Sequence, residues 1–406
     1  MTQIKINRLG LHGDGIADGP VFVPLALPGE MVQGDVEGNK LANMRVLSPS
    51  EDRVKAPCRH FKSCGGCSLQ HASDAFVANF KVDVVQNALA AQGISTEFRP
   101  IETSPVQSRR RAVISARRTK KGAMAGFHMR ASDVICEIPD CQLLHPDLMS
   151  ALGIAERLAI VGASRKGALS VTATLSAEGL DISVTGGKAL DASFIAELGQ
   201  LAHELRIARL TWDGESVATR VPPWQNFGAA QVTPPPGAFL QATKEGEAAL
   251  LQAVQDIVGD AGKLVDLFAG CGTFSLPLAA KASVHAVEGE HDMLQALDQG
   301  WRRAQGLKHV STETRDLFRN PFIAVDLRFD AVVIDPPRAG AEAQCHELAK
   351  SDVPTIAFVS CNPVTFARDA AILIAGGYHL HWVQVVDQFR WSSHIEMVGH
   401  FSRKAA

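Results

Sequence analysis

From about residue 240 onward, short apolar runs rich in β-forming residues alternate with segments long enough for one helix each. This is the pattern of βα units, which build parallel sheets. The helical segments are 244–258 and 273–281, and the strand-like runs are 263–268, 283–287, 331–334 and 355–359. We therefore expect a doubly wound, mostly parallel α/β sheet of the Rossmann-like class, whose ligands bind at the carboxyl ends of the strands.

The chain divides into three expected domains. Its 406 residues are too many for one small module, and 46% hydrophobic with 20% charged residues is typical of a globular protein. Residues 1–52 show short strand patterns broken by turns and predict a small OB-like β-barrel. Residues 53–225 predict a central α+β domain, with a helix over 76–92. Pro222-Pro223 and the proline-rich stretch at 234–237 bracket an irregular segment, which marks the boundary to the α/β domain, residues 226–406.

Charge and hydropathy limit the partners of the chain. The sequence holds no run of about 20 apolar residues and no apolar segment of a secretory signal, so we expect a cytoplasmic protein with no membrane partner. The net charge is −3, but residues 108–121 carry seven cations interleaved with β-forming residues. This segment is either a solvated edge strand or a surface that contacts phosphate groups.

The strand at 263–268 leads into Gly270-Cys-Gly272 and then into a helical segment. Glycines allow the backbone to approach a ligand closely, and a helix N-terminus follows. The dinucleotide-binding fingerprint is not present, because position 275 is Ser. Glu288 ends the next strand, where a carboxylate can accept hydrogen bonds from both hydroxyls of a ribose. These residues favour a nucleoside cofactor without a pyrophosphate, and S-adenosylmethionine fits that description.

Two further strands end in residues suited to chemistry. Asp335 follows the strand at 331–334, and the two prolines after it stiffen the turn that holds its carboxylate. Asp-Pro-Pro is also found in amino-methyltransferases, but these carry an aromatic residue next, and Arg338 argues against that class. Cys361 follows the strand at 355–359 in the position of a nucleophile, and a buried structural thiol is the alternative.

A cysteine beside S-adenosylmethionine is what methylation of uracil at carbon requires. C5 of uracil is a poor nucleophile, but addition of the Cys361 thiolate at C6 would make it an enolate equivalent. The C5 proton must then leave, and Glu396, in an alternating segment typical of a strand, is the candidate base. The alternative for Glu396 is an exposed strand carboxylate.

A separate group of cysteines indicates a metal site. Cys58, Cys64 and Cys67 lie within ten residues, with glycines that let the backbone wrap around a metal, and Cys141 follows far downstream. In a reducing compartment these thiols are not expected to form structural disulfides. Four cysteinates suit either tetrahedral zinc or a [4Fe–4S] cluster, and the spacing leaves both possibilities open.

Together these motifs resemble the bacterial RNA 5-methyluridine methyltransferases, which act on tRNA and on 23S ribosomal RNA, over nearly the whole chain. Residues 1–50, with Gly10-Leu-His-Gly-Asp-Gly-Ile-Ala17 and Val23-Pro-Leu-Ala-Leu-Pro-Gly-Glu30, resemble the RNA-binding TRAM domain of that family. The resemblance implies a [4Fe–4S] cluster rather than zinc, held by the four cysteines. Because members that act on tRNA often lack both the barrel and the cluster, it favours 23S rRNA.

The resemblance also implies roles for single residues. Cys361 is the expected nucleophile, and Glu396 is the expected base. Thr273 stands where relatives often carry Asn, a departure that touches cofactor contacts and not the reaction. The expected contacts to S-adenosylmethionine are Gln241, Phe268, Gly270, Gly272, Glu288 and Asp335, with Asp316 near the adenine.

We therefore expect a monomeric enzyme that methylates C5 of a uridine in structured RNA, with 23S rRNA favoured and tRNA as the alternative substrate. Within catalysis, the alternative reaction is methylation of another target, such as cytosine C5 or an amino nitrogen. From a different class, the alternative is a non-catalytic iron–sulfur protein that binds RNA and senses redox state. The intact Cys361, Asp335 and Glu396 argue against that class.

Overall fold

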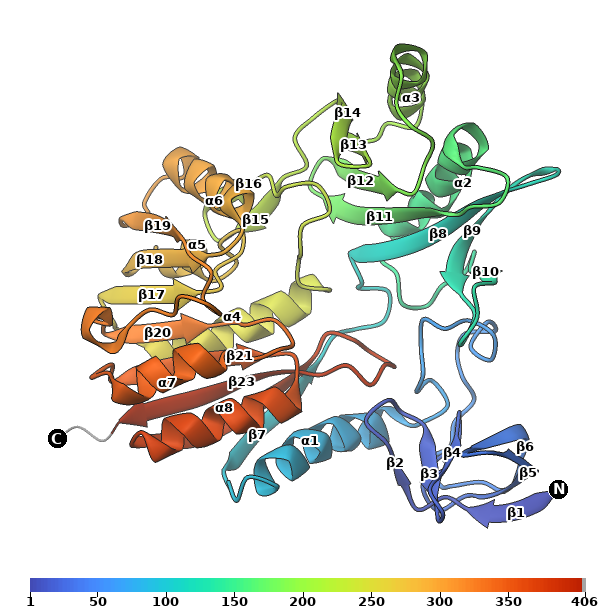
Figure 1. Cartoon of the computed structure of the whole chain (residues 1–406), viewed down its shortest axis with the longest axis horizontal. Coiled ribbons are helices and arrows are strands. Elements are labelled where there is room, and N and C mark those ends of the chain that lie inside the picture. The colour runs from blue at the N-terminus through green and yellow to red at the C-terminus, as the bar shows by residue number, and fades with distance from the viewer. Residues whose placement is uncertain (404–406) are drawn as a thin grey trace.

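The computed structural model describes residues 1–403, which begin with a six-stranded sheet of order β1-β5-β6-β4-β3-β2 (Figure 1). Ile6, Val23 and Val32 are fully buried in its small core. The segment that follows is tied back to this sheet, because Arg53 Nη2 donates to the buried Glu30 carboxylate at 2.7 Å. The strands are β1 (Thr2–Lys5), β2 (Arg8–Leu9), β3 (Gly15–Ala17), β4 (Val21–Val23), β5 (Met31–Glu37) and β6 (Lys40–Ser48).

The central part is a seven-stranded sheet of order β10-β9-β8-β11-β12-β13-β14. Helix α2 packs on β8 and β9, and α3 packs on β14. The strands are β8 (Arg111–Thr119), β9 (Gly122–His128), β10 (Ile135–Glu137), β11 (Leu169–Ser176), β12 (Gly179–Thr185), β13 (Arg209–Trp212) and β14 (Glu215–Thr219). The helices are η1 (Pro146–Met149), α2 (Ser150–Gly162) and α3 (Ala192–Glu204). A hairpin of β15 (Gln225–Phe227) and β16 (Ala230–Val232) leads out of this part.

The last part is an eight-stranded sheet of order β19-β18-β17-β20-β21-β23-β22-β7. The first five strands in that order are parallel, as the alternating pattern predicts, and β23 is antiparallel to both of its neighbours. The strands are β17 (Lys263–Leu267), β18 (Ser283–Glu288), β19 (Val310–Thr314), β20 (Ala331–Ile334), β21 (Thr355–Ser360), β22 (Tyr378–Asp387) and β23 (Glu396–Arg403).

Helices cover both faces of this sheet. Buried side chains of α4, α5 and α6 share one core with the strands, and those of α1, α7 and α8 share another. Of the expected helix over 273–281, residues 275–278 form regular α-helix, because Pro277 removes one backbone donor. The helices are α4 (Lys244–Val258), α5 (Ser275–Leu278), α6 (His291–Arg303), η2 (Ala324–Asp326), α7 (Glu342–Lys350) and α8 (Pro363–Ala375).

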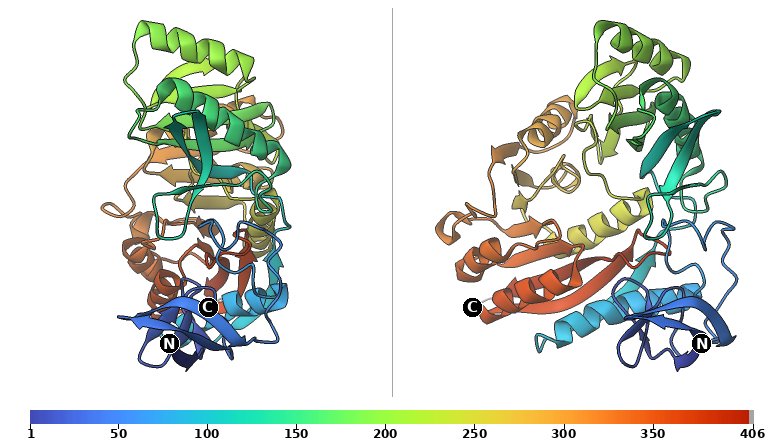
Figure 2. Two further views of the ribbon diagram at one scale, coloured as in Figure 1. Left: turned by 90° about the vertical axis from the view of Figure 1, so that its right-hand side faces the viewer. Right: turned by 45° about the vertical axis from the view of Figure 1, so that its right-hand side comes forward.

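The expected boundary of the central domain, residues 53–225, differs from the structure. Strand β7 (Glu97–Thr103) pairs in parallel with β22 and forms the edge of the C-terminal sheet. Helix α1 (Asp74–Ala90) lies beside α8, as Figures 1 and 2 show, and its Val85 and Leu89 enter the same core as α7 and α8. Helical periodicity predicts that one face of this segment is buried, but it does not identify the element that buries it.

In the parallel sheet the strand order reverses between β17 and β20, and at such a point the loops after neighbouring strands diverge and leave a crevice. The loops after β17, β18, β20 and β21 carry the motifs identified in the sequence. Within residues 1–403, no helix is both long and apolar enough to cross a membrane.

Candidate active site

A cavity of about 830 Å³ lies at the carboxyl ends of the parallel strands. It brings together residues from eight separated segments, including the turns after β17, β18, β20 and β21 and the start of β23. Eight of the nine predicted catalytic and cofactor residues line it: Gln241, Phe268, Gly270, Glu288, Asp316, Asp335, Cys361 and Glu396. The sheet topology therefore gathers motifs that are up to 155 positions apart in the sequence, from Gln241 to Glu396.

Gly272 is the predicted contact that does not line this cavity. Its φ is +92°, and a Cβ at this position would stand 2.8 Å from Leu297 Cγ and 2.9 Å from Leu276 Cδ1. Glycine is therefore needed here for close packing of the turn on α5 and α6, and the expected ligand contact at Gly272 is not what the geometry shows.

Backbone donors hold Glu288 at the end of β18. Its carboxylate accepts hydrogen bonds from the N–H groups of Gly270 at 3.0 Å, Gly289 at 2.7 Å and Glu290 at 3.1 Å. Two of these bonds go to Oε1 and one goes to Oε2, so the carboxylate is fixed without a cation and Oε2 keeps acceptor capacity for a ligand hydroxyl. This arrangement suits the role expected for Glu288 toward a ribose.

Aromatic rings form the wall beside Glu288. Phe268 has a φ of +64°, a strained conformation for a residue with a side chain, and its ring centroid lies 5.5 Å from that of Phe318. Both rings line the cavity, so Phe318 is a candidate contact that the sequence interpretation missed. The Asp316 carboxylate, which also lines the cavity, accepts the N–H groups of Phe318 at 3.0 Å and Arg319 at 3.2 Å and so shapes the turn.

Carboxylates concentrate negative charge between the cofactor side of the cavity and the nucleophile. Burial raises the pKa of Asp266 to about 7, with the charge of Glu288 adding to the effect. Burial likewise raises the pKa of Asp335 to about 7, together with the charges of Asp266 and Glu288. Ser275 Oγ donates to Asp266 Oδ2 at 2.6 Å, while Oδ1 has no hydrogen-bond partner among the described residues. A cationic ligand such as a sulfonium or an ammonium group is suited to this environment.

Cys361 follows β21 and precedes the N-cap of α8, Asn362. Asn362 Nδ2 donates at 2.9 Å to the carbonyl of Arg338, which ties the Asp335–Arg338 turn to the loop that carries the thiol. Burial, followed by the charges of Glu396 and Asp335, raises the pKa of Cys361 to about 12, and the Arg338 guanidinium opposes this. Burial and the two carboxylates therefore favour the protonated thiol, and positive charge nearby favours the thiolate.

Glu396 begins β23 and is 4% exposed, so the alternative of an exposed strand carboxylate is wrong. Burial, with the charge of Asp335, raises its pKa well above the ordinary value, while a hydrogen bond from Gln388 and the charge of Arg338 act in the opposite direction. A buried carboxyl with a raised pKa is suited to accept a proton from a substrate.

A buried lysine is hydrogen-bonded to the loop that precedes Glu396. Lys81 Nζ, from α1, donates to Asp387 Oδ1 at 2.6 Å, to the His394 carbonyl at 2.8 Å and to the Phe389 carbonyl at 3.2 Å. These three bonds join the end of β22 to the start of β23. The sequence interpretation missed Lys81, although its place between Val77 and Val85 on the apolar face of a helix is a signal that could have found it.

Some cations of the basic segment at 108–121 are buried, and others are exposed at the surface. Arg110 is buried, forms an ion pair with Glu247 of α4 and donates to the Gln241 carbonyl at 3.0 Å, so the expectation of an RNA-facing cation is wrong for this residue. Arg109 lines the cavity, with its guanidinium 5.7 Å from the Phe389 ring centroid. The exposed cations lie around the tip of the β8–β9 hairpin and are Arg118, Lys120 and Lys121.

The four predicted metal ligands lie in the loop before α1 and in the turn after β10. Gly66 N donates to Cys64 Sγ at 3.3 Å, and Leu143 N donates to Cys141 Sγ at 3.5 Å. Burial, followed by the charges of Cys141, Cys64 and Cys58, raises the pKa of Cys67 to about 12. Among residues 1–403, no three His, Cys, Asp or Glu side chains are arranged to hold a single metal ion, and all eight cysteines are free of disulfides.

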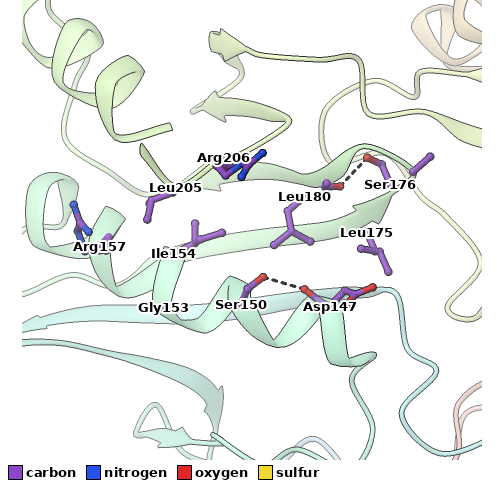
Figure 3. Close-up of a pocket in the computed structure, with 12 residues that line it drawn as sticks. Asp147, Ser150, Gly153, Ile154, Arg157, Leu175, Ser176, Leu180, Leu205 and Arg206 are labelled. Atoms are coloured by element: carbon purple, nitrogen blue, oxygen red, sulfur yellow. Dashed lines mark hydrogen bonds between the residues drawn. The ribbon is translucent and has the colours of Figure 1, made fainter. Parts of the chain in front are cut away.

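A second cavity, of about 620 Å³, lies in the central part of the chain, between α2, the β11–β12 turn and the residues before β13 (Figure 3). Ser150 donates to the Asp147 carbonyl at 2.9 Å there, and Arg157 and Arg206 contribute the cations. None of the predicted site residues lines it, so the candidate active site is the cavity at the strand ends.

Comparison with known proteins identifies relatives of this chain. Residues 231–404 match the model of the tRNA (uracil-5-)-methyltransferase family. The chain is 44% identical to an RNA methyltransferase of Rhizobium meliloti, over 97% of this chain and 98% of that protein. It is 33% identical to the 23S rRNA (uracil(1939)-C(5))-methyltransferase of Chromohalobacter salexigens, over 97% of this chain and 87% of that protein.

Among solved structures, the Pyrococcus abyssi tRNA (uracil-54, C5)-methyltransferase in complex with S-adenosyl-L-homocysteine matches with a TM-score of 0.78. The match covers 98% of this chain and 99% of that chain at 20% identity. It shows that the two proteins share one fold over nearly their whole lengths.

Proposed function

Since the chain belongs to the RNA (uracil-5-)-methyltransferase family, we propose that its substrate is a uridine of 23S rRNA, which it methylates at C5 through a covalent adduct with Cys361. The observation that carries the proposal is that Cys361 and Glu396 line the same cavity as the residues expected to bind S-adenosylmethionine. The 33% identity to a protein named for 23S rRNA supports that RNA over tRNA.

S-adenosylmethionine, when bound, supplies the methyl group as an electrophile. The residues of the cavity fit such a ligand, because Glu288 offers carboxylate oxygens held by backbone N–H groups and Phe268 and Phe318 offer aromatic faces. Asp335, with its pKa raised to about 7, suits the positive charge of the cofactor. Gln241 and Asp316 complete the proposed cofactor contacts.

The nucleophilic step begins at Cys361. The Cys361 thiolate bonds to C6 of the uracil, and the electron pair of the C5–C6 double bond moves to C5, where it is available to bond to the methyl carbon. The positive charge of Arg338 lowers the pKa of Cys361 and so favours the thiolate. The positive charge of S-adenosylmethionine would act in the same direction.

The second half of the reaction needs a base. Glu396 accepts the C5 proton, the electron pair of that C–H bond re-forms the C5–C6 double bond, and the Cys361 thiolate leaves C6. The raised pKa of Glu396 makes its carboxylate a stronger base than an exposed one. The products are 5-methyluridine in the RNA and S-adenosylhomocysteine.

The rest of the chain would hold the RNA. A base within structured RNA must be extruded to reach a buried thiol, so the enzyme needs contacts to the flanking backbone. We propose that the six-stranded sheet of residues 1–52 acts as a TRAM-like RNA-binding domain. The exposed Arg118, Lys120 and Lys121 of the β8–β9 hairpin would contact phosphates.

We further propose that Cys58, Cys64, Cys67 and Cys141 hold a [4Fe–4S] cluster. The backbone N–H groups that donate to Cys64 and Cys141 are of the kind that stabilises cluster thiolates. Anaerobic purification followed by iron and zinc analysis tests this choice.

The experiment that tests the proposed substrate is a map of 5-methyluridine in rRNA and tRNA from cells with and without this gene. Loss of one 5-methyluridine from 23S rRNA is the expected result. Loss from tRNA alone would assign the alternative substrate, and a change in another modified nucleoside would refute the proposed reaction. No change in any RNA would favour the non-catalytic alternative.

A further inference from the structure

The buried amide of Gln388 is hydrogen-bonded to the segment that carries Gln241. Gln388 follows β22, is 1% exposed and belongs to no motif identified in the sequence. Its Oε1 accepts a hydrogen bond from the backbone N–H of Ala242 at 2.7 Å. A backbone N–H can only donate, so the atom facing Ala242 must be the oxygen, and this bond fixes which way the amide points.

The nitrogen of the same amide faces Gln241. Gln388 Nε2 donates to Gln241 Oε1 at 2.5 Å. An amide nitrogen carries two hydrogens, so the second is available to the Glu396 carboxylate, whose pKa is lowered by hydrogen bonding with the Gln388 side chain. The side chain is also confined sterically, because a Cβ at Gly246 would stand 2.5 Å from Gln388 Cβ.

This bonding pattern orients Gln241 as well. Its side-chain oxygen is bound by Gln388, so the end of the Gln241 amide that remains for a ligand in the cavity is its NH₂ group. An NH₂ group is suited to an acceptor such as the carboxylate or a hydroxyl of the cofactor. With the amide of Gln388 reversed or removed, Gln241 is free to flip and present its oxygen instead.

We propose that Gln388 is a positioning residue that orients the cofactor-binding Gln241 and the base Glu396 together, so that cofactor affinity and proton removal depend on one buried amide. The inference rests on the proposed function of both residues. Gln388 contacts neither the reacting carbon atoms nor the thiol in this scheme and acts only through its two partners.

The effect on Glu396 has a definite sign. The charged groups that act on Glu396 are Asp335, which raises its pKa, and Arg338, which lowers it, while Cys361 faces it across the cavity. The hydrogen bond from Gln388 also lowers the pKa of Glu396. Loss of this bond makes the carboxylate harder to ionise, so the acid limb of the pH–rate profile moves to higher pH.

Gln388→Met tests the inference, because Met keeps the length of the side chain and removes both the donor and the acceptor. Loss of one buried hydrogen bond to Gln241 predicts that S-adenosylhomocysteine binds about tenfold more weakly in calorimetry. At saturating cofactor, kcat should fall, and the acid limb of the pH–rate profile should move to higher pH. The matched control is Gln384→Met on β22, the strand that precedes Gln388. The Gln384 amide donates to the Pro100 carbonyl at the surface, so this variant should change neither quantity.

RNA with 5-fluorouridine at the target position separates the two halves of the reaction. Fluorine at C5 cannot be removed as a proton, so wild type and Gln388→Met should both form the covalent adduct at saturating cofactor. Gln388→Glu, which keeps the size and the acceptor for Ala242, provides a second variant if the Met variant unfolds, and it should also raise the acid limb. A folded Gln388 variant with unchanged affinity for S-adenosylhomocysteine and an unchanged pH–rate profile would overturn the role of Gln388. A wild-type enzyme that forms no 5-methyluridine would instead overturn the proposed function.

Discussion

Replacement of Lys81 by Met should destabilise the protein and release the loop that carries the base. The side chains of Lys81 and Asp387 are 0% and 2% exposed, and their ion pair is 2.6 Å long. Without the ammonium, the Asp387 carboxylate keeps the hydrogen bond from Phe389 N at 3.0 Å, and the carbonyls of Phe389 and His394 lose a donor. Leaving one charge of a buried pair without its partner typically costs about 3–5 kcal/mol.

That loss is a large part of the roughly 5–15 kcal/mol that stabilises a typical domain. Urea unfolding followed by circular dichroism measures it, and hydrogen exchange of the peptide that covers 388–396 shows whether this loop opens first. Lys350→Met is the matched control, because Lys350 forms an exposed pair with Glu347, worth at most about 1 kcal/mol. Asp387→Asn in the Lys81→Met background removes the unpaired charge and should recover part of the loss. If Lys81→Met lowered the free energy of unfolding no more than the control does, the proposed role of Lys81 in holding this loop would be wrong.

Four further predictions concern the reaction, the cysteines and the pH dependence of stability. Glu396→Gln should stall after methyl transfer and accumulate an RNA–protein adduct that survives denaturing electrophoresis, whereas fast turnover without an adduct would mean that another residue is the base. Cys361→Ala should form no adduct and should lose at least about 10³-fold in rate, while calorimetry finds S-adenosylhomocysteine bound normally. After anaerobic purification, the Cys141→Ser protein should lack iron, and the Cys136→Ser protein should retain it. A colourless wild-type protein with stoichiometric zinc would show that the proposed [4Fe–4S] cluster is wrong. Burial raises the pKa of Asp266 from 3.8 to about 7. Between these pH values the folded protein therefore holds a proton on Asp266 that the unfolded chain has lost. The free energy of unfolding of the cofactor-free protein should consequently fall as the pH rises from about 4 to about 7. Asp266→Asn should flatten this slope in urea titrations, and an equally steep slope in that variant would contradict the assignment.

Local patterns in the sequence determined most of the C-terminal sheet and much of its site. The helix predicted over 244–258 and the strand over 331–334 have those bounds in the structure. Parallel strands present their carboxyl ends at one edge, so the side chains that follow them in the sequence are brought together by topology alone. Asp335 and Cys361, which each follow a buried strand, could therefore be assigned to one cavity before their separation in space was known.

Only the tertiary structure decided which partner each buried face meets. Helical and strand periodicities report which side of an element is apolar, but they do not report which other element covers that side, because pairing depends on contacts between residues far apart in the chain. For this reason α1 and β7 were assigned to the central domain, and the structure adds them to the C-terminal sheet.

The same limit applies to single polar residues. Lys81, Arg110 and Gln388 look like solvated side chains in the sequence, yet each is buried and satisfied by partners more than 100 positions away. A buried charge or amide is stable only when distant groups complete its hydrogen bonds, and no local pattern encodes those groups. The sequence therefore determined the kinds of elements and the chemistry at their ends, and the packing of distant segments decided which polar side chains hold that chemistry in place.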